Sequence, residues 1–305
     1  MRTRAVPALA VLAGAASLAA LAVPAASAAS GHGSDAARAA VAAATRHAGH
    51  QTATPHVTAR TVAPADEGVG DTAISSVVIN GGKDLAVGTT TTSTVKVTFT
   101  VSDPAGVDLE NNLAILWHGP DNVFDNSDYG FVPNEDAAVC TSTGATTASC
   151  YNTFTITAKP TTDGSEIFSE FAGTWKALVI GAGADGDYVE KDVAKTFRIK
   201  RITKATTAVS ATSVKKGAAL TVTGSLTRAD WTNDKYVSYP TMTLQLQYEK
   251  TGSTTWTVLK NVKADSAGKL KAGVTASATG SYRYVWAGNS ATTAATSAAK
   301  KVTVK

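Results

Sequence analysis

The sequence predicts an all-β protein whose folded part consists of two antiparallel β-sandwiches. Apolar and polar residues alternate with a period of two in many short segments, for example Leu220–Leu226, and this period is typical of strands with one buried face. Thr, Ser, Val and Gly are abundant, whereas Met occurs twice and charged residues make up 17% of the chain. This composition favours strands over helices. A chain of 305 residues is long enough for two domains.

Residues 1–28 have the pattern of a secretory signal peptide. Arg2 and Arg4 precede an apolar stretch of Ala, Leu and Val, and Ala26–Ala28 supplies the small residues of a cleavage site. A membrane anchor is the alternative, but this stretch is short and rich in Ala, and no second stretch of spanning length follows. We therefore expect a secreted, extracellular protein.

Residues 29–70 are of low complexity, and we expect them to form a disordered spacer. The stretch Ala36–Ala48 has high helix propensity but no stripe of large apolar residues with which to dock. His47, His50 and His56 are candidate metal ligands. A polar tail is the simpler interpretation, because zinc sites need four ligands held in a fixed geometry.

Residues 71–202 are expected to form the first folded domain, with six strands separated by turns rich in Gly, Asp, Pro and Asn. Short strands at this spacing are typical of an antiparallel sandwich. The expected strands are Ile74–Asn80, Ser93–Val101, Asn112–His118, Tyr151–Ala158, Thr174–Ile180 and Lys195–Lys200. Alternation predicts an inward-facing set comprising Val95, Val97, Phe99, Leu113, Ile115, Trp117, Phe154, Ile156, Trp175, Ala177, Val179, Phe197 and Ile199.

Cys140 and Cys150 are the only cysteines, and in a secreted chain two cysteines at this spacing predict a disulfide. Closing so short a loop stabilises the fold by roughly 3 kcal/mol on the chain-entropy account. The alternative, a nucleophilic or metal-binding cysteine, needs a paired histidine. The domain contains only His118, which alternation places on the face opposite Leu113 and Ile115.

Acidic residues are concentrated in the first domain, where 17 Asp and Glu against 9 Lys and Arg give a net charge of −8. Two loop clusters are candidate Ca²⁺ ligands, namely Asp121, Asp125 and Asp128, and Asp185, Asp187 and Asp192. Calcium takes six to eight oxygen ligands, which loops supply readily. Neither cluster has the EF-hand spacing, so a calcium site and a set of solvated turns both remain open.

Residues 203–305 are expected to form a second sandwich with seven strands, the number typical of immunoglobulin-like domains. These strands are Thr206–Ala211, Ala218–Arg228, Thr241–Glu249, Thr255–Val262, Lys269–Ala276, Ser281–Ala287 and Ala299–Val304. No cysteine pair joins the expected sheets. The stretch Ala229–Tyr236 interrupts the alternation and predicts a polar connection, in which we expect Trp231 to be buried over one end of the sandwich.

The second domain is basic, because its 14 Lys and Arg against 4 Asp and Glu give a net charge of +10. Three interpretations are open. The domain binds an anionic surface such as a cell-wall polymer or polysaccharide, it attracts the acidic domain, or its lysines protect exposed edge strands from pairing. Nucleic acid is not an expected partner, since no motif that interleaves aromatic and basic residues is present.

From Val209 onward the chain resembles a C-terminal domain of secreted actinobacterial proteins with two immunoglobulin-like sandwiches. The residues that carry this resemblance are Ser213–Gly217, Leu220–Trp231, Leu244–Tyr248 and Gly280–Tyr284. In the first domain, Ser102–Asp108 and Asp185–Tyr188 resemble the module that accompanies it. The resemblance implies export and this fold, and it supplies no catalytic motif. Some relatives carry a calcium-binding label.

We therefore expect a secreted, non-enzymatic binding or structural protein. Its acidic loops are candidates for binding Ca²⁺, and its basic domain for binding an anionic cell-surface polymer. The alternative is a secreted carbohydrate-active enzyme or its accessory binding module. No Ser-His-Asp set, Gly-x-Ser-x-Gly motif or metal triad supports an enzyme, but a pair of carboxylates facing a cleft is not visible in a sequence.

Overall fold

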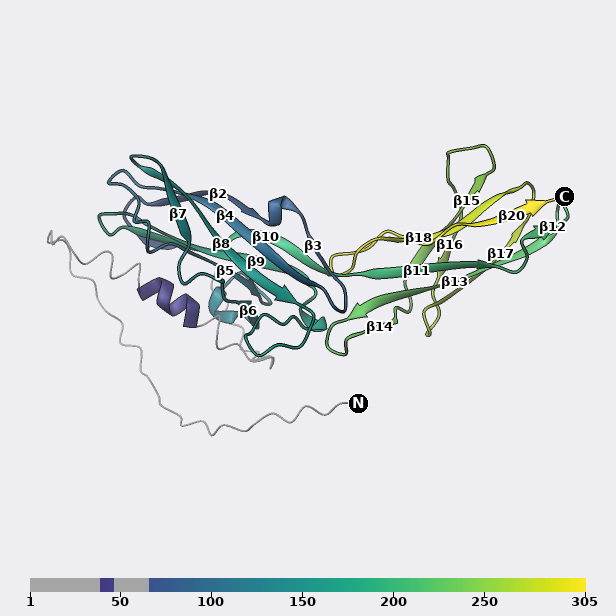
Figure 1. Cartoon of the computed structure of the whole chain (residues 1–305), viewed down its shortest axis with the longest axis horizontal. Helices are drawn as coiled ribbons and strands as arrows, with labels where there is room; N and C mark the ends of the chain where they lie inside the picture. The colour runs from purple at the N-terminus through teal and green to yellow at the C-terminus, as the bar shows by residue number, and fades with distance from the viewer. Residues whose placement is uncertain (1–38, 47–65) are drawn as a thin grey trace, which may run out of the picture. The chain divides into compact units, whose positions relative to one another are not determined.

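A computed structural model describes residues 39–46 and 66–305, and shows an all-β protein with four sheets (Figure 1). Two sheets form a sandwich from residues 67–201, and two form a second sandwich from residues 203–304. The expected signal peptide, the expected spacer outside residues 39–46 and 66–70, and His47, His50 and His56 lie outside the described residues.

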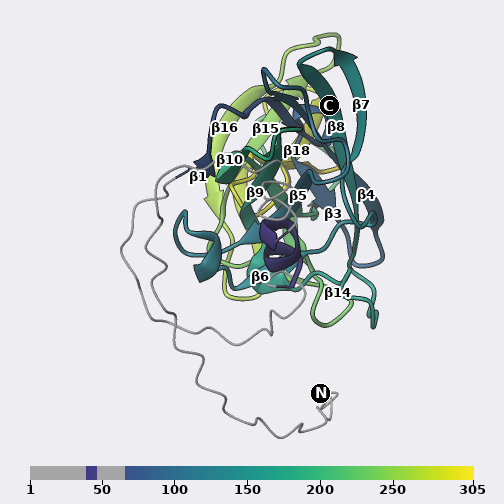
Figure 2. The same cartoon turned by 90° about the vertical axis from the view of Figure 1, so that its left-hand side faces the viewer.

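The first sandwich has the strand order of an immunoglobulin domain. One sheet has the order β2-β4-β8-β7, and the other β1-β10-β9-β5-β6 with the short β3 paired in parallel to β10. Figure 2 views this sandwich from its end, with β4, β7 and β8 on one side and β1, β9 and β10 on the other. The strands are β1 Glu67–Val69, β2 Ala73–Ile79, β3 Leu85–Val87, β4 Thr92–Ser102, β5 Leu113–His118, β6 Tyr129–Phe131, β7 Val139–Gly144, β8 Thr147–Thr157, β9 Gly173–Ala182 and β10 Tyr188–Arg201.

The second sandwich repeats this arrangement in outline, although β14 pairs with β13, whereas β7 of the first sandwich pairs with β8. One sheet contains β11, β13, β14 and β17, and the other has the order β12-β20-β18-β15-β16 with β19 on β18. The short β12 pairs in parallel with the last strand, β20, as β3 does with β10 in the first sandwich. The strands are β11 Thr203–Val209, β12 Ser213–Val214, β13 Ala219–Asp230, β14 Lys235–Ser238, β15 Thr243–Lys250, β16 Thr257–Lys263, β17 Lys269–Thr275, β18 Gly280–Trp286, β19 Ala295–Thr296 and β20 Lys300–Val304. The chain therefore contains the same sandwich plan twice.

Each of the thirteen strands predicted from alternation corresponds to a strand of the structure, but several short strands were not predicted. Among them are β7, which is polar along its length, and β14, which lies in the predicted polar connection. In β7 and β8, Cys140 and Cys150 are direct cross-strand partners and form the predicted disulfide. Cys150 belongs to the core of the first sandwich, so the bond ties an exposed edge strand to that core.

The predicted facing of β5 is wrong. Leu113, Ile115 and Trp117 are buried, but they lie on the outer face of their sheet, whereas Ala114 and Leu116 face the core between the sheets. Strand β9 is likewise buried on both faces. A strand that buries both faces shows no contrast between apolar and polar positions, so alternation does not reveal which set points inward.

A short helix at residues 39–46 contributes to the cover of this outer apolar face. Ala44 is buried in one cluster with Leu113, Ile115, Trp117, Phe124, Leu178 and Ile180. Ala40 and Val41 pack against the same cluster. The helix propensity of this stretch was predicted, but its docking was not, because its small side chains form no strong apolar stripe.

The junction between the sandwiches is tight, since a single residue, Ile202, separates β10 from β11. Trp231 is 1% exposed and belongs to the core cluster of the first sandwich. Its indole Nε1–H donates to the carbonyl of Val87 at 3.1 Å, and its backbone N–H donates to the Ser169 hydroxyl at 2.8 Å. Trp231 was expected to cover an end of its own sandwich, but instead it completes the core of the first.

Replacing Trp231 with Ala should lower the free energy of unfolding of the first sandwich by roughly 3–5 kcal/mol, because the substitution leaves a large cavity. Urea denaturation followed by fluorescence and circular dichroism measures this loss. Lys235→Ala, an exposed change in the same hairpin, is the control and should change stability by less than about 0.5 kcal/mol. Loss confined to the second sandwich would contradict the assignment.

Candidate functional site

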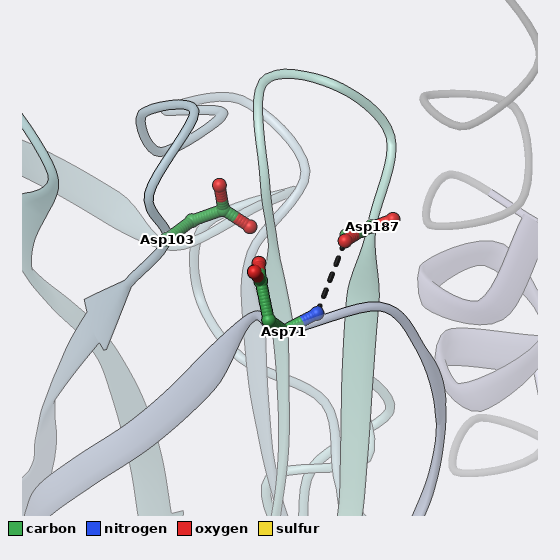
Figure 3. Close-up of side chains that lie close together, drawn as sticks. All are labelled: Asp71, Asp103 and Asp187. Carbon is green, nitrogen blue, oxygen red and sulfur yellow. Dashed lines mark hydrogen bonds between the residues drawn. The ribbon is translucent and has the colours of Figure 1, made fainter.

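Three aspartates from distant parts of the chain meet at one end of the first sandwich (Figure 3). Asp71, Asp103 and Asp187 each place a carboxylate oxygen within 4.8 Å of the others. They come from the turn before β2, the end of β4 and the turn before β10. In the described part of the chain, this is the one group of three or more such ligands at metal-binding separations.

Two glycines leave room for these carboxylates. A Cβ atom at Gly183 would lie 2.2 Å from Asp103 Oδ2 and 2.9 Å from Asp185 Oδ1. A Cβ atom at Gly70 would overlap the carboxylate of Asp187, at 1.5 Å, and Gly70 also has a φ of +83°, which favours glycine. The backbone therefore comes close to the acidic groups from two sides.

Asp103 is the rigid member of the cluster. It is 1% exposed, accepts a hydrogen bond from the Thr72 hydroxyl at 2.6 Å on Oδ2, and accepts one from the Ala105 N–H at 2.8 Å on Oδ1. Asp187 Oδ2 accepts the backbone N–H of Asp71 at 3.0 Å, which links the turn before β2 to the turn before β10. Asp71 itself is exposed, so its carboxylate reaches solvent.

The electrostatics of the cluster favour a cation. Desolvation, followed by the negative charges of Asp103, Asp187 and Asp185, raises the pKa of the Asp71 carboxyl. Among the described residues, no Lys or Arg forms an ion pair with these aspartates, whereas Lys191 pairs with Asp66 and Lys200 with Asp84. A divalent ion would relieve the mutual repulsion, and carboxylate oxygens at this spacing suit a hard cation such as Ca²⁺.

The residues predicted as calcium ligands have different surroundings. Asp187 belongs to the cluster, and Asp185 lies beside it with Oδ1 accepting the Asp187 N–H at 3.2 Å. Asp192 is not part of the cluster, and its Oδ2 instead accepts a hydrogen bond from the backbone N–H of Phe124 at 3.0 Å. Asp71 and Asp103 were not predicted, because neither belongs to the two acidic loop clusters identified in the sequence.

The other predicted set, Asp121, Asp125 and Asp128, does not converge on one point. Asp121 accepts hydrogen bonds from the Val123 N–H at 2.9 Å and the Asn126 amide at 2.8 Å, and so shapes its own loop. Asp128 lies 2.6 Å from Nδ1 of His118. Asp125 lies in the one-turn 3-10 helix Phe124–Asn126.

A second acidic region lies along the pairing of β1 with β10. Glu67 and Glu190 are direct cross-strand partners, an arrangement in which like charges destabilise pairing. Desolvation, then the charges of Asp192, Glu67 and Asp125, raise the pKa of the Glu190 carboxyl to about 7. Desolvation is also the main cause of the raised pKa of the Asp192 carboxyl.

The raised pKa of Glu190 predicts that its contribution to stability is largest below about pH 4.5 and is lost as the pH rises through about 7. Glu190→Gln keeps the neutral form at every pH. At pH 8 the variant should therefore be more stable than the wild type by roughly 1–2 kcal/mol, allowing for screening at a half-buried group. At pH 4 the two should match. Urea denaturation at both pH values measures this, and a variant no more stable at pH 8 would contradict it.

Two cavities of the described chain each contain a single carboxylate. The larger, about 590 Å³, is lined by Tyr129, Val132, Asn134, Asp163 and neighbouring residues, and Asp163 is its single carboxylate. Hydrogen bonds from Ser165 lower the pKa of Asp163 to about 2, so this group stays ionised and is unsuited to donate a proton. The smaller, about 180 Å³, contains Asp84 as its single acid.

No family model and no curated protein matches the chain. Solved structures with similarity include the fibronectin(III)-like modules of Clostridium thermocellum CbhA (TM-score 0.30, 12% identity, 75% of this chain and 95% of that chain). Three N-terminal domains of the bacteriophage RB49 outer capsid protein Hoc give a TM-score of 0.32, with 13% identity over 77% of this chain and 70% of that chain. The D00-D0 domain of Intimin gives 0.24, with 13% identity over 74% and 98%. The immunoglobulin-like fold follows from the strand order and register of the chain itself.

Proposed function

We propose that this is a secreted, non-enzymatic binding protein whose basic second sandwich attaches to an anionic polymer outside the cell. The observation that carries the proposal is the state of the lysines. All twelve lysines of residues 203–305 are exposed, and none forms an ion pair with a described residue. Their charge is therefore available to a partner, which long-range attraction would guide to this domain.

Other features support an extracellular binding role. The Cys140–Cys150 disulfide is characteristic of proteins that fold in an oxidising compartment. Among the described residues, no helix has the length and apolar character needed to cross a membrane. Neither of these two cavities has paired carboxylates, so neither supports the alternative of a carbohydrate-active enzyme.

Binding of the full chain to polygalacturonate should weaken steeply as NaCl is raised from 50 to 500 mM, because exposed charges are screened. Neutral dextran should not bind. The double charge reversal Lys263→Glu with Lys301→Glu should weaken binding more than Lys83→Glu with Lys159→Glu, a reversal of equal charge in the first sandwich. Isothermal titration calorimetry measures the salt dependence, the dextran control and the affinities of the two double variants. Binding that does not depend on salt would contradict the electrostatic account.

A second proposed activity is the binding of Ca²⁺ by Asp71, Asp103 and Asp187, with Asp185 beside them. The observation that favours it is the convergence of three carboxylates from three loops that the chain brings together from positions 116 residues apart. In this role the ion would join the turns before β2 and β10 and stabilise that end of the sandwich. The first sandwich would then be a rigid, calcium-stabilised support for the basic one.

Saturating Ca²⁺ should raise the Tm of the full chain by several degrees relative to chelator, since a ligand that binds only the folded state stabilises it. Asp71→Asn, at the exposed member of the cluster, should remove most of this shift. Asp125→Asn, a matched change outside the cluster, should retain it. Mg²⁺ at equal ionic strength controls for screening. An equal shift in wild type and Asp71→Asn would exclude this cluster as the site.

A further inference from the structure

The outer face of the sheet β12-β20-β18-β15-β16 carries an ordered polar network. Arg283 on β18 is the register partner of Gln247 on β15, so both side chains lie on the same face. Arg283 Nε donates to Gln247 Oε1 at 2.9 Å, and Gln247 Nε2 donates to Gln245 Oε1 at 2.9 Å. Tyr282, Tyr284, Leu244 and Leu246, at the alternate positions, face the core.

The guanidinium of Arg283 is also held from one side by an aromatic ring. Its Cζ lies 3.8 Å from the centroid of the half-buried Trp256, a cation–π contact that restricts the side chain. Neither Nη group of Arg283 has a hydrogen-bond partner among the described residues. Arginine offers a planar pair of donors that matches carboxylate and phosphate oxygens, and here that pair is oriented before any ligand arrives.

The surroundings of Arg283 suit an anionic, hydroxyl-rich ligand. Lys263 on β16 and Lys301 on β20 are exposed on strands at either side of the network, and Glu249 is the acidic residue on the intervening strand β15. Gln245 and Gln247 provide amide donors and acceptors for hydroxyl groups. Val258, 46% exposed and opposite Gln247 in the register, adds an apolar contact at the edge.

We infer that this face is the polymer-binding surface, and that Arg283, fixed between Trp256 and Gln247, binds a carboxylate or phosphate of an anionic carbohydrate polymer. The inference rests on the proposed function of the second sandwich and adds a position and a recognition residue to it. It differs from attraction by dispersed lysines, because a fixed arginine recognises the geometry of the anion, whereas mobile lysines respond only to charge.

The test measures binding of the full chain to polygalacturonate, poly(glycerol phosphate) and dextran by isothermal titration calorimetry. Arg283→Gln should weaken binding about tenfold or more, the loss expected when a charge-assisted hydrogen bond is removed. Arg283→Lys keeps the charge and should lose most of the same affinity. The matched control Lys269→Gln, on the outer face of the opposite sheet, should change affinity by about twofold or less. The first two polymers distinguish carboxylate from phosphate as the anion.

Trp256→Ala removes the aromatic support without changing charge, and should also weaken binding while leaving its salt dependence unchanged. Thermal melts of each variant show whether the second sandwich stays folded. If Trp256→Ala unfolds it, Arg283→Lys still tests the inference. Equal losses for Arg283→Gln and Lys269→Gln would overturn the inference but keep the proposed function. Absence of binding by the wild type would overturn both. A complex formed between two copies, through the acidic domain of one and this face of the other, would also overturn it, and light scattering detects that complex.

Discussion

The long pairing between β9 and β10 fixes both ends of the first sandwich. At one end of this pair, Tyr188 opposes Ala182, and the turn between them carries Asp185 and Asp187. At the other end, β10 runs into the junction, where the Arg201 side chain donates through Nε to the carbonyl of Ala229. A register shift between Lys191 and Lys195 separates these two parts of the strand. Since a slip of one residue would reverse every side chain, the acidic turn and the junction depend on the same ladder of hydrogen bonds.

Much of this architecture could be predicted from the sequence, because most of the thirteen predicted strands have one apolar face and therefore alternate. The facing of β5 could not, since a run such as Leu113–Trp117 is apolar at every position. Trp231 was predicted to be buried, but its contacts in the first sandwich could not be predicted. Alternation indicates which residues face a core, and it does not show how two domains pack against each other. Only one of the three aspartates of the cluster was predicted from the sequence as a calcium ligand. Asp187 stands among other acids, whereas Asp71 and Asp103 are single residues at strand ends, and only the folded chain brings them to it.

The two domains repeat one topology and carry opposite charge, and they handle that charge in different ways. In the first sandwich, acids are drawn into the structure. Asp103 and Glu166 are buried, and Glu190 has an acid directly opposite it. In the second, the lysines are exposed, and Arg283 is held by an aromatic ring and an amide. The first sandwich therefore buries part of its negative charge, whereas the lysines of the second are all exposed.

The insertion of Trp231 into the neighbouring core has a consequence for how such proteins diversify. Tandem immunoglobulin-like domains are often treated as independent units that can be exchanged at the linker. Here, separating the domains at Ile202 would leave a cavity in the core of the first sandwich and expose the indole of Trp231 on the second. Exchange of one sandwich would therefore have to transfer the β13–β14 hairpin together with the part of the first sandwich that receives Trp231.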